Sequence, residues 1–211
     1  MELTPELIEV ARPPSPRGVV IVLHGGASRR ENMRVSPAQL SVLRMIPIAR
    51  RIARTGRGEL AVFRLLNSRR GWDAHHTPVR DVEWALDRVA ELLGPSLPVC
   101  LVGHSLGGRA ALMSAGAPQV RGAVALAPWV LPTDDPPGLD AGRLLIVHGD
   151  RDRIASPQRS AALAERLRRR GQRVEFVSVP GGKHAMLGHH AEFTAPAAEF
   201  AAAVLREPVT A

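Results

Sequence analysis

The 211-residue sequence contains no tyrosine, only four phenylalanines and three tryptophans, and a single lysine, Lys183. Its basic side chains are therefore almost all arginines, and these are spread along the whole chain. Single-stranded nucleic-acid grooves combine cations with stacking aromatic residues. The net charge of +8 therefore does not point to a nucleic-acid partner. We expect most arginines to lie on solvated helix faces, with contact to an anion as the alternative.

Cysteine and long apolar runs are scarce as well. Cys100 has no second cysteine to pair with, which excludes an internal disulfide and two-cysteine metal patterns. We expect it to be a buried strand residue. No apolar run approaches the roughly 20 residues of a membrane span, and residues 1–10 lack the basic segment of a secretory signal. These features favour a cytoplasmic protein with no membrane partner.

The sequence does contain a regular alternation of apolar runs and amphipathic stretches. Gly18–Leu23 is a continuous apolar run, typical of a strand buried on both faces. Similar runs follow at residues 60–65, 98–102, 122–126, 144–147 and 174–179. This alternation predicts one α/β domain over residues 1–211, with a mostly parallel sheet and helices on both faces. Residues 3–10 are expected to add an edge strand.

Two of the intervening helices have clear start signals. Thr77 and Pro78 provide an N-cap and a first-turn proline for a helix that continues to residue 93. Ser156 and Pro157 do the same for a second helix, and Gly171 is placed to end it. Short strand–helix units of this kind require no separate linker or second domain.

One strand leads directly into a helix at Gly103-His104-Ser105-Leu106-Gly107. A G-x-S-x-G sequence at such a junction is typical of a nucleophile elbow, in which small residues let the chain turn sharply. The serine hydroxyl is then exposed at a helix N-terminus, where backbone N–H groups favour developing negative charge. We therefore predict that Ser105 is a nucleophile.

A serine at its ordinary pKa needs a general base, and two later strands end at suitable residues. The run 144–147 leads into His148-Gly149-Asp150-Arg151-Asp152, and the run 174–179 leads into Pro180-Gly181-Gly182-Lys183-His184. Parallel sheets place their sites at the carboxyl ends of the strands. Both segments are therefore expected to reach the same edge as Ser105.

These motifs, with Leu23-His24-Gly25-Gly26, resemble the α/β-hydrolase superfamily along nearly the whole chain. The similarity is greatest to compact dienelactone-hydrolase-like and esterase-like members, although dienelactone hydrolases carry a cysteine in place of Ser105. The superfamily's H-G-x-x-D pattern implies Asp152 as the acid, ahead of Asp150. Asp134 or Asp135 would be the acid of members that keep it after the preceding strand.

The same resemblance implies His184 as the base, because it follows a glycine pair as the superfamily's histidine does. His189 and His190 are the alternatives, although a surface position beside the next helix suits them better. For the oxyanion hole it implies the backbone N–H of Leu106 and a second N–H from Gly26 or Ala27. His24 is expected to orient that loop.

A polar loop at residues 67–76 follows another strand and should border the pocket. The residues expected around the substrate are His24, Trp72, His75, His104 and Trp129. His75 and His76 lack a third ligand at metal-site spacing, so neither a metal nor another cofactor is expected.

The resemblance implies a serine hydrolase that cleaves a small carboxylic ester, thioester or lactone through an acyl-enzyme. Its partner would be a small acyl substrate. An acyltransferase or a small-peptide hydrolase would use the same triad, and a non-catalytic ligand-binding protein can share the fold. Residues 127–143 contain four prolines, which disfavour a continuous helix. We therefore expect no sizeable cap and an open site that suits short acyl groups.

Overall fold

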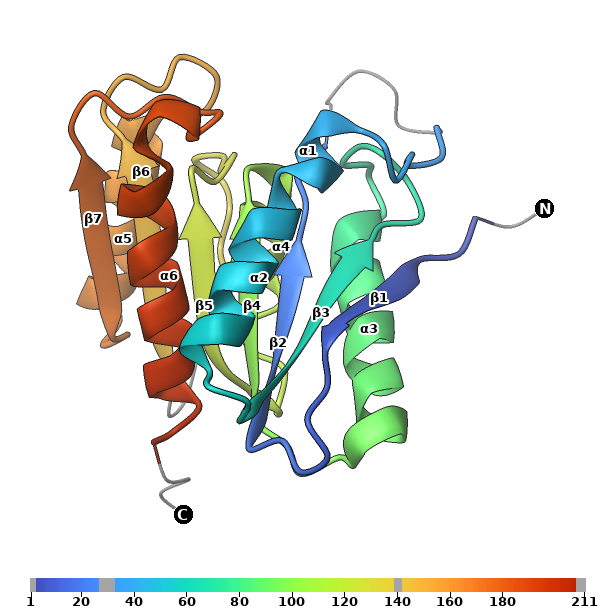
Figure 1. Ribbon diagram of the computed structural model, residues 1–211. Helices are drawn as coiled ribbons and strands as arrows, with labels where there is room; N and C mark the ends of the chain where they lie inside the picture. Colours follow the sequence, from blue (N-terminus) through green and yellow to red (C-terminus); the bar gives the residue numbers. More distant parts are fainter. Residues whose placement is uncertain (1–2, 27–32, 139–141, 208–211) are drawn as a thin grey trace.

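The computed structural model describes residues 3–26, 33–138 and 142–207. Within these residues one seven-stranded sheet has the order β1-β3-β2-β4-β5-β6-β7 (Figure 1). Its parallel strands are β2 (Gly18–Leu23), β3 (Leu60–Leu66), β4 (Val99–His104), β5 (Val120–Leu126), β6 (Arg143–Gly149) and β7 (Val174–Val179). The edge strand β1 (Glu6–Ala11) pairs antiparallel with β3. The predicted parallel sheet and its edge strand are confirmed.

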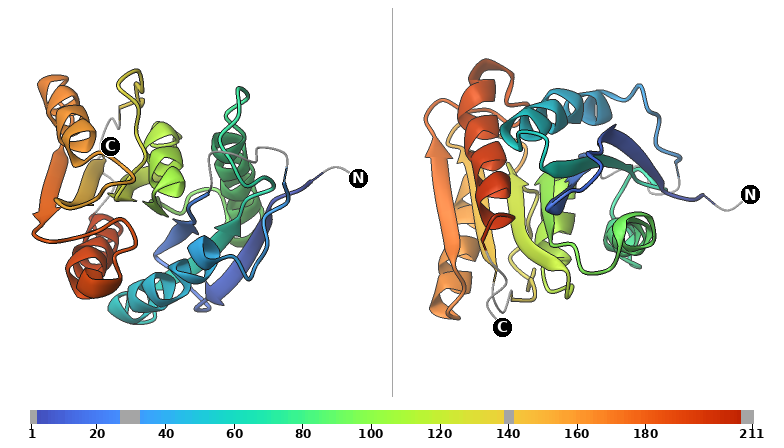
Figure 2. Two further views of the ribbon diagram at one scale, coloured as in Figure 1. Left: turned by 90° about the horizontal axis from the view of Figure 1, so that it is seen from above. Right: turned by 60° about the horizontal axis from the view of Figure 1, so that its bottom comes forward.

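Helices cover both faces of the sheet (Figures 1 and 2). On one face lie α2 (Met45–Thr55) and α6 (His190–Val204), whose apolar side chains pack on inward-facing strand residues. On the other lie α3 (Thr77–Leu93), α4 (Leu106–Met113) and α5 (Pro157–Arg169). Two short elements, α1 (Leu40–Leu43) and η1 (Leu187–His189), precede α2 and α6. Two hydrophobic cores thus enclose the central strands, which explains their continuous apolar runs.

The helix signals are confirmed at α5 and need one correction at α3. Ser156 caps α5 by accepting the Arg159 N–H, and Gly171 follows the helix with a φ of +80°. Thr77, however, is the first residue of α3 and not its N-cap. The Asp73 carboxylate accepts both the Thr77 N–H and its hydroxyl, so capping comes from the preceding loop.

The carboxyl ends of the parallel strands meet at one edge of the sheet, at the top of Figure 1. Leu23 pairs with Gly103, His104 with Leu126, Leu126 with Val147, and Gly149 with Val179, so the segments after these five strands begin at nearly the same level. The described residues between β5 and β6 contain no helix, in agreement with the expected lack of a cap. None of the helices in the described ranges has the length and apolarity needed to cross a membrane.

Candidate active site

Ser105 lies at the strained turn between β4 and α4. Its φ of +55° and ψ of −116° are rare for a residue with a side chain, and strain of this kind persists only where the surroundings enforce it. Here the Ser105 N–H donates to the Leu126 carbonyl, while the Ser105 carbonyl accepts the N–H groups of Arg109 and Trp129. Backbone contacts on both sides therefore hold the serine in place.

The glycines of the motif are required by close backbone approach. A Cβ on Gly103 would lie 2.1 Å from the Gly107 carbonyl oxygen, and one on Gly107 would lie 2.5 Å from the His24 carbonyl oxygen. Neither position can accept a side chain without moving the turn. This geometry explains why a glycine stands two residues before and two residues after the serine.

The structure brings Ser105, His184 and Asp152 together from three separate loops. His184 Nε2 lies 2.9 Å from Ser105 Oγ, and His184 Nδ1 lies 2.7 Å from Asp152 Oδ2. A carboxylate can only accept, so Nδ1 carries the proton and Nε2 is free to accept the serine hydroxyl. The arrangement can remove a proton from Ser105 and stabilise the imidazolium that results.

Asp152 is fully enclosed and receives four hydrogen bonds. Its Oδ2 accepts from His184 and also from His148 Nε2 at 3.1 Å, while its Oδ1 accepts the N–H groups of Ile154 and Ala155. Burial alone would raise the pKa of this carboxyl. The hydrogen bonds outweigh burial and hold the pKa of Asp152 well below its ordinary value. Asp152 is therefore ionised across the pH range in which the protein would work.

The other acids and histidines that the sequence left open lie elsewhere. Exposed Asp150 accepts the Gly181 N–H and has no contact with the histidine. Asp134 is buried in a two-bond ion pair with Arg109. Asp135 pairs with Arg170 on the surface. His189 and His190 begin α6, and the His190 ring lies next to Thr194. Among the described residues only Asp152 reaches His184 with a carboxylate.

The loop after β2 runs beside the elbow. A Cβ on Gly26 would lie 2.1 Å from the Arg70 carbonyl oxygen, so only glycine fits at this position. His24 donates from Nδ1 to the Gly25 carbonyl at 2.6 Å and accepts the Asn67 N–H at Nε2. Burial lowers the pKa of His24 to about 4, so the ring stays neutral in this role. Ala27, the other expected oxyanion donor, falls outside the described residues.

A cavity of about 370 Å³, the Ser105 cavity, opens beside the nucleophile. It is lined by Gly25, Gly26, Ser41, Arg44, His104, Ser105, Leu106, Trp129, Ile154 and His184. Gly26 and Leu106, both expected at the oxyanion hole, therefore face the same space as the nucleophile. So do His104 and Trp129, two of the five residues expected around the substrate.

The other three expected pocket residues do not line this cavity, and their placement corrects the prediction. His24 is buried behind Gly25 and Asn67. Trp72 instead packs against the apolar core and stacks under the Arg109 guanidinium, 3.9 Å from the ring centre. His75 is exposed, and its N–H is taken by Asp73. In the same loop, buried Asp81 accepts both the N–H and the hydroxyl of Ser68.

Sequence reasoning missed four residues of the site. His148 donates the second histidine bond to Asp152, and its own Nδ1 accepts the buried Ser160 hydroxyl. The H-G-x-x-D pattern contains His148 but says nothing of its orientation. Ser41, Arg44 and Ile154 line the cavity from segments without a recognisable motif.

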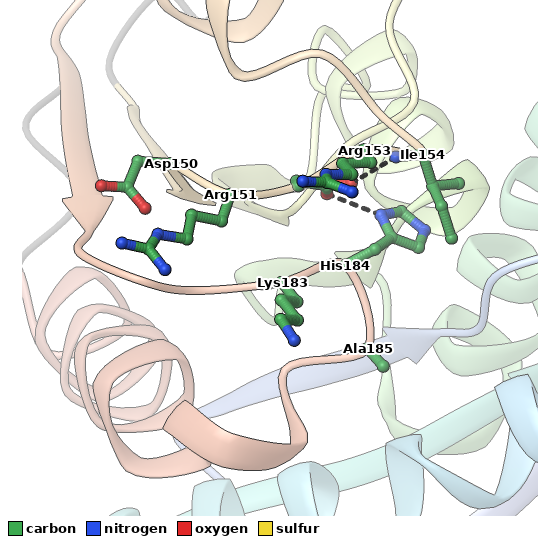
Figure 3. A pocket seen from close by; sticks show the side chains of 8 residues that line it. Asp150, Arg151, Arg153, Ile154, Lys183, His184 and Ala185 are labelled. Atoms are coloured by element: carbon green, nitrogen blue, oxygen red, sulfur yellow. Dashed lines mark hydrogen bonds and ion pairs between the residues drawn. The ribbon is translucent and has the colours of Figure 1, made fainter.

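A second, more exposed space of about 810 Å³, the outer cavity, is also bordered by His184 (Figure 3). It shares His184 and Ile154 with the Ser105 cavity. Its remaining lining residues are Asp150, Arg151, Asp152, Arg153, Lys183 and Ala185. Three cations thus surround the approach to the histidine.

Comparison of the sequence with models of protein families shows to which family the chain belongs. The model of the alpha/beta hydrolase family matches residues 20–155, which is more than half of the chain and includes both Ser105 and Asp152. The chain belongs to the alpha/beta hydrolase family. The model of the prolyl oligopeptidase family matches residues 129–207, the part of this hydrolase that carries Asp152 and His184. No curated protein matches the hydrolase significantly by sequence.

Solved structures share the fold of this hydrolase at low sequence identity. An alpha-beta serine hydrolase homologue from Coxiella burnetii is 20% identical, with a TM-score of 0.68 over 91% of this chain and 89% of that one. A serine hydrolase without a lid from Xanthomonas campestris is 20% identical, with a TM-score of 0.66 over 98% and 90%. A Pyrobaculum calidifontis esterase is 16% identical, with a TM-score of 0.65 over 95% and 84%. At these identities the similarity establishes the fold.

Proposed function

We propose that this protein is a serine hydrolase that cleaves a small carboxylic ester, or a related thioester or lactone. The observation that carries the proposal is the hydrogen-bonded chain from Ser105 Oγ through the His184 ring to Asp152, with distances of 2.9 and 2.7 Å. These distances are within the range that direct proton transfer requires. Two of the structural neighbours are described as serine hydrolases and a third as an esterase, which supports the same reaction class.

In the proposed reaction, neutral His184 takes the Ser105 proton while Oγ attacks the acyl carbonyl carbon. The tetrahedral intermediate collapses as His184 returns the proton to the departing alcohol oxygen, which leaves an acyl group on Ser105. Water then attacks that acyl group while His184 accepts a proton from it, and His184 returns this proton to Ser105 Oγ as the C–O bond breaks and the acid is released. No cofactor takes part in these steps.

The developing oxyanion needs two aligned N–H donors. The Leu106 N–H is the first donor, because it belongs to the opening turn of α4, where amide groups lack intrahelical partners. The loop at Gly26 supplies the second. Arg70 packs against Gly26 and fixes the distance of this loop from the elbow.

The direct test is labelling by a fluorophosphonate probe, followed by a panel of ester, thioester, lactone and amide substrates. We expect Ser105 to be the labelled residue and Ser105→Ala to abolish both labelling and turnover. Ser114, which is also buried near α4, provides the matched control, because Ser114→Ala should keep both. Labelling of a serine other than Ser105 would contradict the proposal.

Small-peptide hydrolysis is the second candidate, since residues 129–207 match the prolyl oligopeptidase family. The same triad could also transfer the acyl group to an alcohol. The amide substrates in the panel separate the first possibility from ester hydrolysis. An added alcohol separates the second, because a transferase would form a new ester in preference to the free acid.

A further inference from the structure

Arg44 is a cation in the wall of the Ser105 cavity that forms no ion pair with another described residue. It joins α1 to α2, and its side chain lines the cavity together with Ser105 and His184. Its Nε–H is buried and has no hydrogen-bond partner among the described residues. Burial lowers the pKa of Arg44, with no carboxylate in the described ranges to offset it. The Arg44 side chain is half-buried, and a buried N–H group without a partner is costly, so a ligand that accepts from it would be favoured.

The neighbouring histidine cannot neutralise this charge. His104 Nε2 donates to the His184 carbonyl at 2.9 Å, so Nδ1 carries no proton. That Nδ1 is buried in the wall of the same cavity and lacks a partner among the described residues. Burial lowers the pKa of His104 to about 3, and the nearby positive charge of Arg44 acts in the same direction. Among the described residues that line this cavity, Arg44 therefore supplies a positive charge and none supplies a carboxylate.

The side chains around the outer cavity are also mainly positively charged. Arg151, Arg153 and Lys183 are exposed around it, and none of them forms an ion pair with another described residue (Figure 3). Asp150, the exposed acid in this wall, accepts the Gly181 N–H and keeps its charge, so the three cations outnumber the two carboxylates of the lining, Asp150 and Asp152. Clustered like charges around a concave site raise the local concentration of oppositely charged ligands. These exposed groups would attract an anion, while Arg44 could hold it next to the nucleophile.

We propose that the substrate of this hydrolase carries a carboxylate close to its ester, and that the Arg44 guanidinium binds this carboxylate while Ser105 attacks the ester carbonyl. The inference rests on the proposed function. A guanidinium fork matches the two oxygens of a carboxylate. The limited volume of the Ser105 cavity, about 370 Å³, suits a monoester of a short dicarboxylic acid. The carboxylate itself is unchanged by the reaction.

The test compares monomethyl adipate with methyl hexanoate, which has the same acyl chain length but no charge. Their kcat/KM values are measured by pH-stat titration at constant ionic strength. 4-Acetoxybutyrate is added to place the charge on the alcohol side, and a phosphate-bearing acetate ester to separate phosphate from carboxylate. We expect the wild-type protein to prefer a carboxylate-bearing ester over its neutral counterpart.

Arg44→Gln should lower that preference on the order of 10- to 100-fold, mainly through KM, because one charge-assisted contact is lost. Arg44→Lys should retain part of it, since it keeps the charge but not the fork. The matched control is Arg50→Gln, which makes the same charge change on the exposed face of α2 outside the cavity. It should leave the preference unchanged. Should Arg44→Gln fail to fold, Arg44→Lys supplies the comparison.

Binding to Ser105→Ala, measured by calorimetry, separates this inference from the proposed function. Charge-selective binding of monomethyl adipate that weakens with Arg44→Gln would support the anion site even if no ester were turned over. Turnover with equal rates for charged and neutral esters would overturn the anion site and leave the hydrolase intact. Preference for the phosphate ester, or an equal loss of preference in Arg50→Gln, would also overturn it.

Discussion

The most informative single substitution is Asp152→Asn, because the two oxygens of Asp152 have different partners. Oδ1 accepts two backbone N–H groups, from Ile154 at 2.8 Å and Ala155 at 3.0 Å. An asparagine must keep its oxygen there to satisfy both donors. Its NH2 group then takes the place of Oδ2 and faces His184 Nδ1 and His148 Nε2. Two ring N–H donors would meet an amide donor.

His184 can relieve this conflict by moving its proton from Nδ1 to Nε2. The ring would then present an N–H to Ser105 and could no longer accept the hydroxyl proton. The stabilisation of the imidazolium by a carboxylate would be lost as well. We expect kcat to fall on the order of 10³- to 10⁴-fold with little change in KM. This corresponds to about 4 to 5.5 kcal/mol of transition-state stabilisation.

Steady-state kinetics on a p-nitrophenyl ester measures the effect, with Asp150→Asn as the matched control. Asp150 is exposed and accepts only the Gly181 N–H among its described bonds, so its replacement should lower kcat less than about 3-fold. Circular dichroism checks that both variants fold. A larger loss in Asp150→Asn than in Asp152→Asn would refute the reasoning and reassign the acid.

Three further predictions concern stability and specificity. Because burial lowers the pKa of His24 from 6.5 to about 4, its neutral form stabilises the fold fully above pH 6.5. Acidification to pH 4 should remove about 3 kcal/mol, and a Tm that does not change between pH 7 and 4.5 would contradict this. Arg109→Met leaves Asp134 buried without its partner, which should cost about 3 to 5 kcal/mol and lower Tm by roughly 10 °C. Arg88→Met, which breaks an exposed pair with Glu91, should lower Tm far less. In a p-nitrophenyl ester series from C2 to C16, kcat/KM should be highest at about C2 to C6, because a cavity of about 370 Å³ encloses few methylenes. A maximum at C12 or longer would contradict this expectation and require an apolar acyl groove outside the Ser105 cavity.

The sheet could be predicted because its signal is local. A strand buried on both faces needs consecutive apolar side chains, and each predicted run lies within an observed strand or overlaps it by most of its length. Helix α2 was harder to read. Met45, Ile48 and Ile52 are buried at helical spacing, but three of the eleven residues are arginines and Pro47 lies in the first turn. Its packing on the sheet beside α6 depends on residues about 150 positions away, which no local pattern encodes.

The site likewise has parts that the local sequence predicts and parts that depend on distant residues. The elbow is recognisable because the close approach of Gly103 to the Gly107 carbonyl acts within five consecutive residues. Trp72 was misplaced because the direction of its loop is decided by the Ser68–Asp81 bonds and by stacking on Arg109. These partners lie outside the loop. A residue type after a strand end therefore indicates that a side chain is near the site, while tertiary hydrogen bonds decide whether it faces the cavity.

Four histidines cluster at this edge, yet the hydrogen bonds leave only one that can act as base for Ser105. The unprotonated nitrogen of His24 is occupied by the Asn67 N–H, and that of His148 by the Ser160 hydroxyl. His104 keeps a free Nδ1, but its other nitrogen is tied to the His184 carbonyl and its pKa is lowered to about 3 by burial. An imidazole with so low a pKa is a weak base, whereas His184 has a carboxylate behind it that stabilises the protonated ring. The three buried imidazoles thus add hydrogen bonds without competing for the proton, and transfer from Ser105 is directed to His184.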